Sequence, residues 1–263
     1  ALESAEQAGR AINQVSLFGE GDSSIQPASL INVPSWSEKE KLKNEKMALG
    51  FYLSGHPFNA YAEELKHFVR TRLDRLNPQR EPQLLAGIVY AVRMQVTRRG
   101  RMAVVVLDDG SGARVELVVY SELFESARSW LKEDQLLIVE ARVNNRGGDD
   151  EYGNGLRITA DQLYNLGTAR SRYAKYVELH CNGTSNAARL KELLAPHRAD
   201  NHAGNAGKAK SDNNWSCPVL LFYRNQDAAC KLELGDAWRV SLEENLLESL
   251  YAHFKEENVR VVY

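Results

Sequence analysis

A change in hydrophobic periodicity at Leu84 constrains the fold of this chain more than any other feature of its sequence. From this point apolar residues alternate with polar ones and many are β-branched, which is the pattern of strands with one buried face. Five strands are predicted, at residues 84–96, 102–107, 114–120, 136–143 and 156–163. One helix is predicted at residues 121–131, between the third and fourth strands. Long strands with a single interposed helix specify a fold more narrowly than the number of strands alone.

The order of these elements is that of an OB-fold barrel, in which one helix separates the third and fourth of five strands. The predicted strands are joined by a basic turn at 98–101, an acidic turn at 108–112 and a Gly-rich loop at 144–155. We therefore expect an OB-fold domain over residues 81–168. OB folds commonly bind nucleic acids through the first of these turns and the loop between strands four and five.

The segments on either side of the barrel predict an α+β, multi-domain chain. Residues 1–36 are expected to hold the end of a preceding helical region and a linker, and residues 37–80 a helical connector. In the connector, Ser37 and Glu40 form a capping-box pattern for a helix expected to stop at Gly55, and a second helix is predicted at 59–73. Residues 169–263 are expected to form a small α+β domain whose last helix begins at the capping box of Ser241 and Glu244.

The charge balance restricts how the chain can bind nucleic acid. Its 33 Lys and Arg residues are outweighed by 35 Asp and Glu residues, so a globally basic nucleic-acid binder is excluded and any such binding must be local. No apolar run approaches the ~20 residues needed to cross a bilayer, and no secretory signal is visible. The three cysteines, Cys181, Cys217 and Cys230, lack metal-ligand spacing and are expected to be free thiols. The sequence thus predicts a cytoplasmic protein without membrane contact.

Two sets of residues are candidates for binding. Gln14, Leu17 and Phe18 form a Gln-x-x-Leu-Phe peptide whose apolar pair could enter a partner's pocket, although the pair could instead pack on the chain's own helices. The candidates for single-stranded DNA are the basic residues of two barrel loops and one aromatic residue, namely Arg98, Arg99, Arg101, Arg142, Asn145, Arg146 and Tyr120. Because Tyr120 is the one stacking candidate on the second and third strands, we expect weak, salt-sensitive binding.

Three segments in this order resemble the C-terminal region of the alpha subunit of bacterial DNA polymerase III, the replicative polymerase large subunit. They are residues 14–18, the segment LGFYLSGHP at 49–57, and the hairpin and turn at 96–112. The resemblance implies that Gln14, Leu17 and Phe18 bind the beta sliding clamp and that the OB domain contacts template. It also implies that the last domain binds the tau subunit of the clamp loader, with Trp238, Arg239, Val259, Val261 and Tyr263 as candidate contacts.

The same resemblance implies that this part of the chain is not an enzyme. The parent subunit would be a DNA-directed DNA polymerase using Mg²⁺, with its catalytic acids in a domain upstream, and no cofactor or metal is expected here. One alternative is a stand-alone OB-fold protein that binds tRNA or single-stranded DNA. Another is a metal-dependent nuclease using Asp108 and Asp109, but adjacent strand residues face opposite ways and the following glycines favour a turn.

Overall fold

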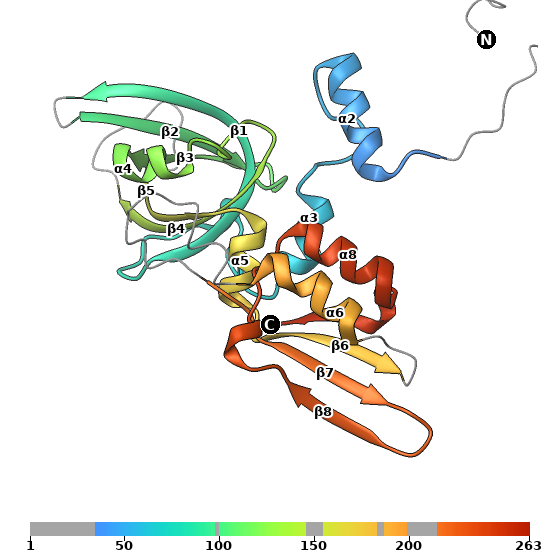
Figure 1. Ribbon diagram of the computed structural model, residues 1–263. Coiled ribbons are helices and arrows are strands. Elements are labelled where there is room, and N and C mark those ends of the chain that lie inside the picture. The colour runs from blue at the N-terminus through green and yellow to red at the C-terminus, as the bar shows by residue number, and fades with distance from the viewer. Residues whose placement is uncertain (1–34, 98–99, 146–154, 183–186, 199–214) are drawn as a thin grey trace, which may run out of the picture. The chain divides into compact units, whose positions relative to one another are not determined.

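The computed structural model describes residues 35–97, 100–145, 155–182, 187–198 and 215–263 (Figure 1). The chain divides into two compact units, Ala1–Phe51 and Tyr52–Tyr263. In the first unit, helix α2 (Glu38–Leu49) begins with the predicted capping box of Ser37 and Glu40. It ends at Gly50 and not at Gly55, because Gly50 adopts a left-handed conformation (φ 83°) and its N–H bonds the carbonyl of Lys46.

The second connector helix is shorter than the sequence predicted. Helix α3 (Asn59–Leu65) ends at Leu65, and a 3₁₀ turn, η1 (Leu73–Arg75), follows after an extended stretch. The prediction of one helix over 59–73 was wrong: Arg72 is extended, and the backbone N–H of Leu73 donates to the carboxylate of Asp109 in the barrel, at 3.0 Å. A contact so distant in the sequence replaces a local helical hydrogen bond.

The predicted OB-fold barrel is confirmed. Its strands are β1 (Gln83–Thr97), β2 (Gly100–Asp108), β3 (Arg114–Tyr120), β4 (Leu136–Asn145) and β5 (Leu156–Tyr164), with α4 (Ser121–Ala127) between β3 and β4. They close in the order β1-β2-β3-β5-β4, and the β3–β5 pair is parallel. Inward-facing Val, Leu and Ile residues fill the barrel, among them Val105, Leu117 and Val139. A Cβ on Gly87 would lie 3.1 Å from the Cβ of Leu107 and 3.2 Å from backbone atoms of Asp108, so a larger residue there would require β2 to shift by a few tenths of an ångström.

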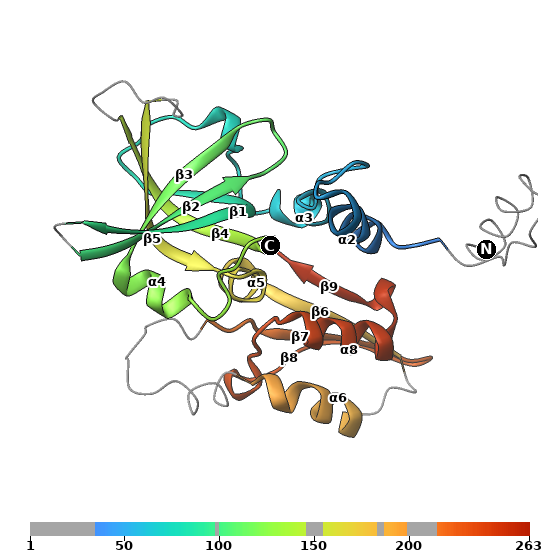
Figure 2. The ribbon, with the colours of Figure 1, turned by 90° about the horizontal axis from the view of Figure 1, so that it is seen from above.

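The C-terminal part of the chain is the expected small α+β domain. Its elements are β6 (Tyr176–Asn182), α6 (Ala187–Leu194), β7 (Val219–Arg224), β8 (Ala229–Glu233), α8 (Glu244–Phe254) and β9 (Val259–Val262), with the 3₁₀ turns η2 (Ala195–His197), η3 (Asp236–Trp238) and η4 (Glu256–Asn258). The sheet order is β8-β7-β6-β9, with β6 and β7 parallel. Helices α6 and α8 pack on one face of this sheet, burying Leu190, Leu194, Leu246 and Leu250 (Figures 1 and 2).

The start of α8 differs from its prediction. Its N-cap is Glu243, without a side-chain capping bond, so the capping box of Ser241 and Glu244 is wrong. Ser241 instead belongs to an extended segment, because its N–H donates to the carbonyl of His197 and its neighbour Val240 bridges to Cys217. Within the described residues, no helix is long and apolar enough to cross a membrane.

Helix α5 (Leu166–Tyr173), which the sequence did not predict, joins the barrel to the C-terminal domain. The side chain of Asn165 caps it by accepting from the N–H of Thr168, at 2.8 Å. Ala169 packs in a cluster with barrel and connector residues that include Leu65 and Ile138. The following residue, Arg170, binds carboxylates from both flanking parts of the chain, so α5 contacts the connector, the barrel and the C-terminal domain together.

Candidate nucleic-acid interface

The hairpin formed by β1 and β2 carries the first basic loop. The first part of β1 pairs with β4 and the remainder with β2, so the far end of the hairpin extends away from the barrel body (Figure 1). Arg101 lies at this end, paired in register with Val96, and is exposed. Arg101 forms no ion pair with any described residue, whereas Arg98 and Arg99 lie outside the described residues. One free guanidinium of the predicted three is therefore placed where a phosphate could reach it.

The adjoining ends of β4 and β5 carry the second set of candidate residues. Arg142 points to Asp161 on β5 and forms an ion pair of 2.8 Å, so its charge is already compensated. Asn145 is exposed at the end of β4, and Arg146 lies outside the described residues. Arg157, which the sequence analysis missed, is exposed at the start of β5 opposite Asn144 and has no ion pair within the described part. Arg157 is the second residue after the predicted Gly-rich loop at 144–155, and this position is the sequence signal that could have identified it as a candidate contact.

Two exposed tyrosines lie on the outer wall of the barrel. Tyr120 ends β3, opposite Met102, and is 46% exposed. Tyr90 was not predicted: a register shift in β1 between Val89 and Ala91 turns it outward, and it is 53% exposed. The guanidinium of Arg114 lies 3.7 Å from the centre of its ring. Because Arg114 and Tyr120 stand at opposite ends of β3, the two tyrosines do not form one continuous stacking surface.

The acidic turn after β2 is structural, as the sequence predicted. The carboxylate of Asp108 accepts from the N–H of Gly110 and that of Asp109 from the N–H of Ser111, each at 2.9 Å. Burial raises the pKa of Asp108, but its hydrogen bonds with Arg114 and Gly110 and the nearby His56 lower it more, so the net shift is downward. No group of carboxylates, histidines or cysteines in the described residues could hold a metal ion. This turn does not support the nuclease alternative.

His56 from the segment before α3 packs against the same turn. Its Nε2 lies 3.3 Å from Asp108, and its Nδ1 accepts from the N–H of Phe58 at 3.3 Å. A Cβ added to Gly110, which has φ of 72°, would approach the His56 ring to 3.1 Å. His56 therefore packs against the acidic turn, and it does not cap α3, whose N-cap is Phe58 without a side-chain capping bond.

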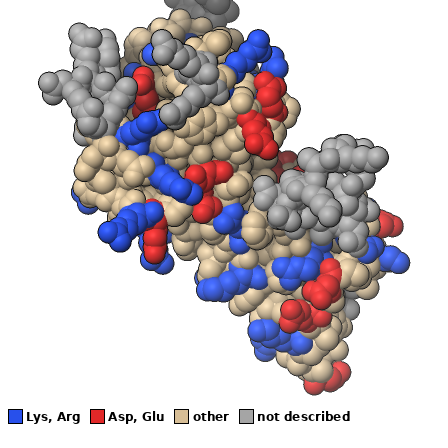
Figure 3. Space-filling model, turned by 90° about the vertical axis from the view of Figure 1, so that its left-hand side faces the viewer, with Lys and Arg blue, Asp and Glu red and all other residues tan. Residues whose placement is uncertain are grey.

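Acidic side chains accompany the basic ones over much of the surface. Arg93 on β1 pairs with Glu116 on β3 at 3.8 Å, and Arg114 pairs with Asp108 at 2.8 Å. On the face seen in Figure 3, the Lys and Arg side chains of the described residues are interspersed with Asp and Glu. Attraction of a nucleic acid by this surface therefore depends on a few uncompensated cations, such as Arg101 and Arg157.

The candidate contacts of the C-terminal domain are in part tied to the chain itself. Arg239 binds the backbone carbonyl of Ser216 at 2.6 Å, and Trp238 is covered by the guanidinium of Arg198, 4.9 Å from its ring centre. Val259 and Val261, both on β9, are buried and half-buried. Tyr263 donates its hydroxyl to Glu64 at 2.5 Å and stacks on His67. The clamp candidates Gln14, Leu17 and Phe18 lie outside the described residues.

Comparison with known proteins identifies the two folded parts separately. Residues 84–166 match the family described as OB-fold nucleic acid binding domain, and residues 210–252 match DNA polymerase III subunit alpha, C-terminal domain. The chain is homologous to the C-terminal region of the DNA polymerase III alpha subunit. It is 38% identical over 263 residues to DNA polymerase III subunit alpha of Neisseria meningitidis serogroup B (strain MC58), covering 99% of this chain and 21% of that protein.

A second relative, DNA polymerase III subunit alpha of Escherichia coli K12, is 31% identical over 276 aligned residues, covering 100% of this chain and 22% of the relative. The chain thus spans about a fifth of the length of these relatives. Among solved structures, the OBody AM3L09 bound to hen egg-white lysozyme matches 36% of this chain and 92% of its own, with 17% identity and a TM-score of 0.32. The resemblance expected from the sequence motifs is confirmed by the two relatives.

Proposed function

We propose that this chain is the non-catalytic C-terminal part of a bacterial replicative DNA polymerase alpha subunit. In this role it binds the beta sliding clamp, single-stranded template DNA and the tau subunit of the clamp loader. The observation that carries the proposal is the similarity to DNA polymerase III alpha subunits over 99 to 100% of the chain. The parent subunit would be the DNA-directed DNA polymerase, with its catalytic acids outside this chain.

The geometry of the barrel supports weak binding of single-stranded DNA. Arg101 and Arg157 are exposed and form no ion pair with described residues, so each could contact a phosphate without breaking an existing bond. Most other cations on the barrel wall are already paired with carboxylates, and the aromatic residues are separated. An OB domain of this kind guides a strand that other contacts hold nearby, because its own affinity is low.

The clamp contact is tested with the full chain and purified beta clamp by surface plasmon resonance. Replacing both apolar anchors, Leu17→Ala with Phe18→Ala, is expected to lower the affinity at least tenfold, because anchors of this type supply most of the energy of a short peptide contact. The control is Leu30→Ala with Ile31→Ala, an apolar pair from the same N-terminal segment. Equal affinities of wild type and the Leu17, Phe18 variant would contradict the clamp assignment.

The tau contact is tested by pull-down of the same chain with purified tau. Retention of tau by the wild type is expected, and retention should fall with Trp238→Ala while Leu232→Ala, an exposed apolar control on β8, remains unaffected. A wild-type chain that retains no tau would remove this part of the proposal and leave the clamp and DNA contacts to be judged separately.

A further inference from the structure

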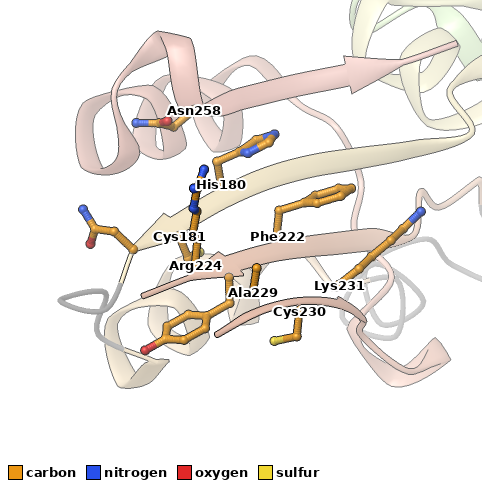
Figure 4. Close-up of a pocket in the computed structure, with 10 residues that line it drawn as sticks. His180, Cys181, Phe222, Arg224, Ala229, Cys230, Lys231 and Asn258 are labelled. Carbon is orange, nitrogen blue, oxygen red and sulfur yellow. The ribbon is translucent and has the colours of Figure 1, made fainter. Parts of the chain in front are cut away.

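The C-terminal sheet has one face that no described helix covers. Residues of β6, β7 and β8 alternate between the face under α6 and α8 and this open face. In register, His180 on β6 is opposite Phe222 on β7, and Phe222 is opposite Lys231 on β8. Figure 4 shows these three side chains on the same side of the sheet, with Cys230 on the other. Three neighbouring strands thus place two aromatic rings and an ammonium group in one row.

The two rings form an ordered stack beside a hollow. Their centres are 5.0 Å apart and their planes differ by 10°, while the Nζ atom of Lys231 lies 5.4 Å from the centre of the Phe222 ring. The adjoining hollow has a volume of about 500 Å³ and is also bordered by Asn182, Arg224 and Asn258. This volume is within the range of sites that bind small ligands, ~300–1,000 Å³.

Charged side chains also lie on this open face. Arg224 lies at the end near the β7–β8 turn and Lys231 in the middle of β8, with its Nζ 5.9 Å from the ring centre of Tyr176, and neither cation forms an ion pair with a described residue. The carboxylates of the same face, Glu178 and Glu233, lie nearer the opposite end, where Glu178 contacts His180 at 3.5 Å. The hollow is therefore lined by two cations, Arg224 and Lys231, that no described carboxylate compensates.

We propose that this open face is a second contact surface for single-stranded DNA, separate from the barrel loops. Parallel aromatic rings offer a flat surface on which a base can stack, and the flanking cations can neutralise phosphates of the same strand. An acidic peptide would use Arg224 and Lys231 but would have no need of the ordered His180–Phe222 stack. The inference adds a DNA site to a domain for which the proposed function names only a protein partner.

The test measures binding of fluorescein-labelled oligothymidylate to the full chain by anisotropy at several salt concentrations. Arg224→Gln with Lys231→Gln is expected to lower the slope of log K against log salt by about 1.4, since each lost phosphate contact lowers it by about 0.7. Phe222→Leu is expected to weaken binding about tenfold with an unchanged slope, because it removes stacking and no charge. The control is Arg189→Gln with Lys191→Gln on α6, which removes two charges from the helix-covered side.

Two readouts distinguish DNA binding at the open face from DNA binding at the barrel and from binding of a protein partner. Combined with Arg101→Gln, the loss of slope should add to that of the barrel variant, and photocrosslinking of iodouracil-substituted DNA should label Phe222 or His180. The proposal is overturned if the Arg224, Lys231 variant binds DNA as the wild type does. It is equally overturned if polyglutamate binds this face and the DNA crosslinks map to the barrel alone.

Discussion

At the scale of single residues, Asp109 shows how one buried carboxylate can organise two parts of the chain. Its side chain is 2% exposed, and it accepts hydrogen bonds from the N–H groups of Leu73 in the connector and Ser111 in the acidic turn. The guanidinium of Arg72 lies 3.7 Å away and compensates part of its charge. Two backbone donors satisfied by one carboxylate make this side chain a structural link between connector and barrel.

Asp109→Ala is expected to lower the free energy of unfolding by about 2–3 kcal/mol, because it leaves the buried N–H of Leu73 and the partly buried N–H of Ser111 without an acceptor. Urea denaturation of the full chain measures this change. The control is Asp74→Ala, whose exposed carboxylate meets Arg75 at 4.0 Å and should contribute less than about 0.5 kcal/mol. Equal effects of the two substitutions would show that Asp109 is not a structural link.

The sequence predicted the acidic turn but not this link. The glycines at 110 and 112 identify a turn from neighbouring residues, since they supply the positive φ angles of 72° and 91°. The partner of Asp109 is 36 residues distant, and no local pattern indicates which backbone donor a buried carboxylate will meet. Tyr90 was missed for a similar reason, because its outward direction depends on a register shift between β1 and β2.

At the scale of elements, helix α5 is held by a buried ion-pair network. Arg170, with a side chain 9% exposed, binds Glu64 on α3 through two bonds of 2.6 and 2.7 Å and Glu244 on α8 at 2.6 Å. Burial raises the pKa of Glu64, but Arg170 and the Tyr263 hydroxyl lower it more, so Glu64 is held ionised. The same carboxylate raises the pKa of Tyr263, in addition to the effect of burial. One ion-pair network, formed by Glu64, Arg170 and Glu244, therefore links the connector, α5 and the C-terminal domain.

Arg170→Ala is expected to lower the free energy of unfolding by about 3 kcal/mol, because Glu64 loses its compensating charge in a partly buried position. Glu244→Ala should cost less than about 1 kcal/mol, since the Glu244 side chain is 64% exposed and water screens its pair. Both values come from urea denaturation, with hydrogen exchange reporting whether α3 and β9 loosen. A larger effect of the Glu244 substitution would contradict this assignment of the network.

The failure to predict α5 has a physical cause. A helix that packs one face on a single hydrophobic core shows apolar residues at a period of 3.6. In α5 three consecutive residues, Ala169, Arg170 and Ser171, are buried because different parts of the chain surround the helix. The hydroxyl of Ser171 accepts from the N–H of Leu242, and Arg170 meets its carboxylates. The barrel strands, which face one core, followed the expected period and were predicted.

At the scale of the whole molecule, binding of nucleic acid depends on a small number of cations on a nearly neutral chain. The formal net charge is −2, and acidic and basic side chains are interspersed on the face of Figure 3. Long-range attraction of DNA is therefore weak, and short-range contacts at exposed arginines have to supply the electrostatic part of the affinity. The family assignment was accessible from sequence motifs, but which arginines are free required the structure.

Arg101→Gln with Arg157→Gln is expected to lower the salt slope of oligothymidylate binding by about 1.4, because two phosphate contacts are lost. Arg142→Gln should change it less, since Arg142 is paired with Asp161. Fluorescence anisotropy over a range of salt concentrations measures both. If the double variant keeps the wild-type slope, the barrel loops do not contact phosphate and the strand lies elsewhere.

The position of α5 also has a consequence for how this chain can change over evolution. Exposed residues of the barrel surface, such as Arg101 and Arg157, can accept substitutions one at a time. Residues of α5 contact the connector, the barrel and the C-terminal domain. A tolerated change at Ala169 or Arg170 therefore needs a matching change in the connector or the C-terminal domain. Barrel and C-terminal domain should consequently be inherited as a pair, and exchanging one of them between relatives should succeed only when α5 and its partners are transferred with it.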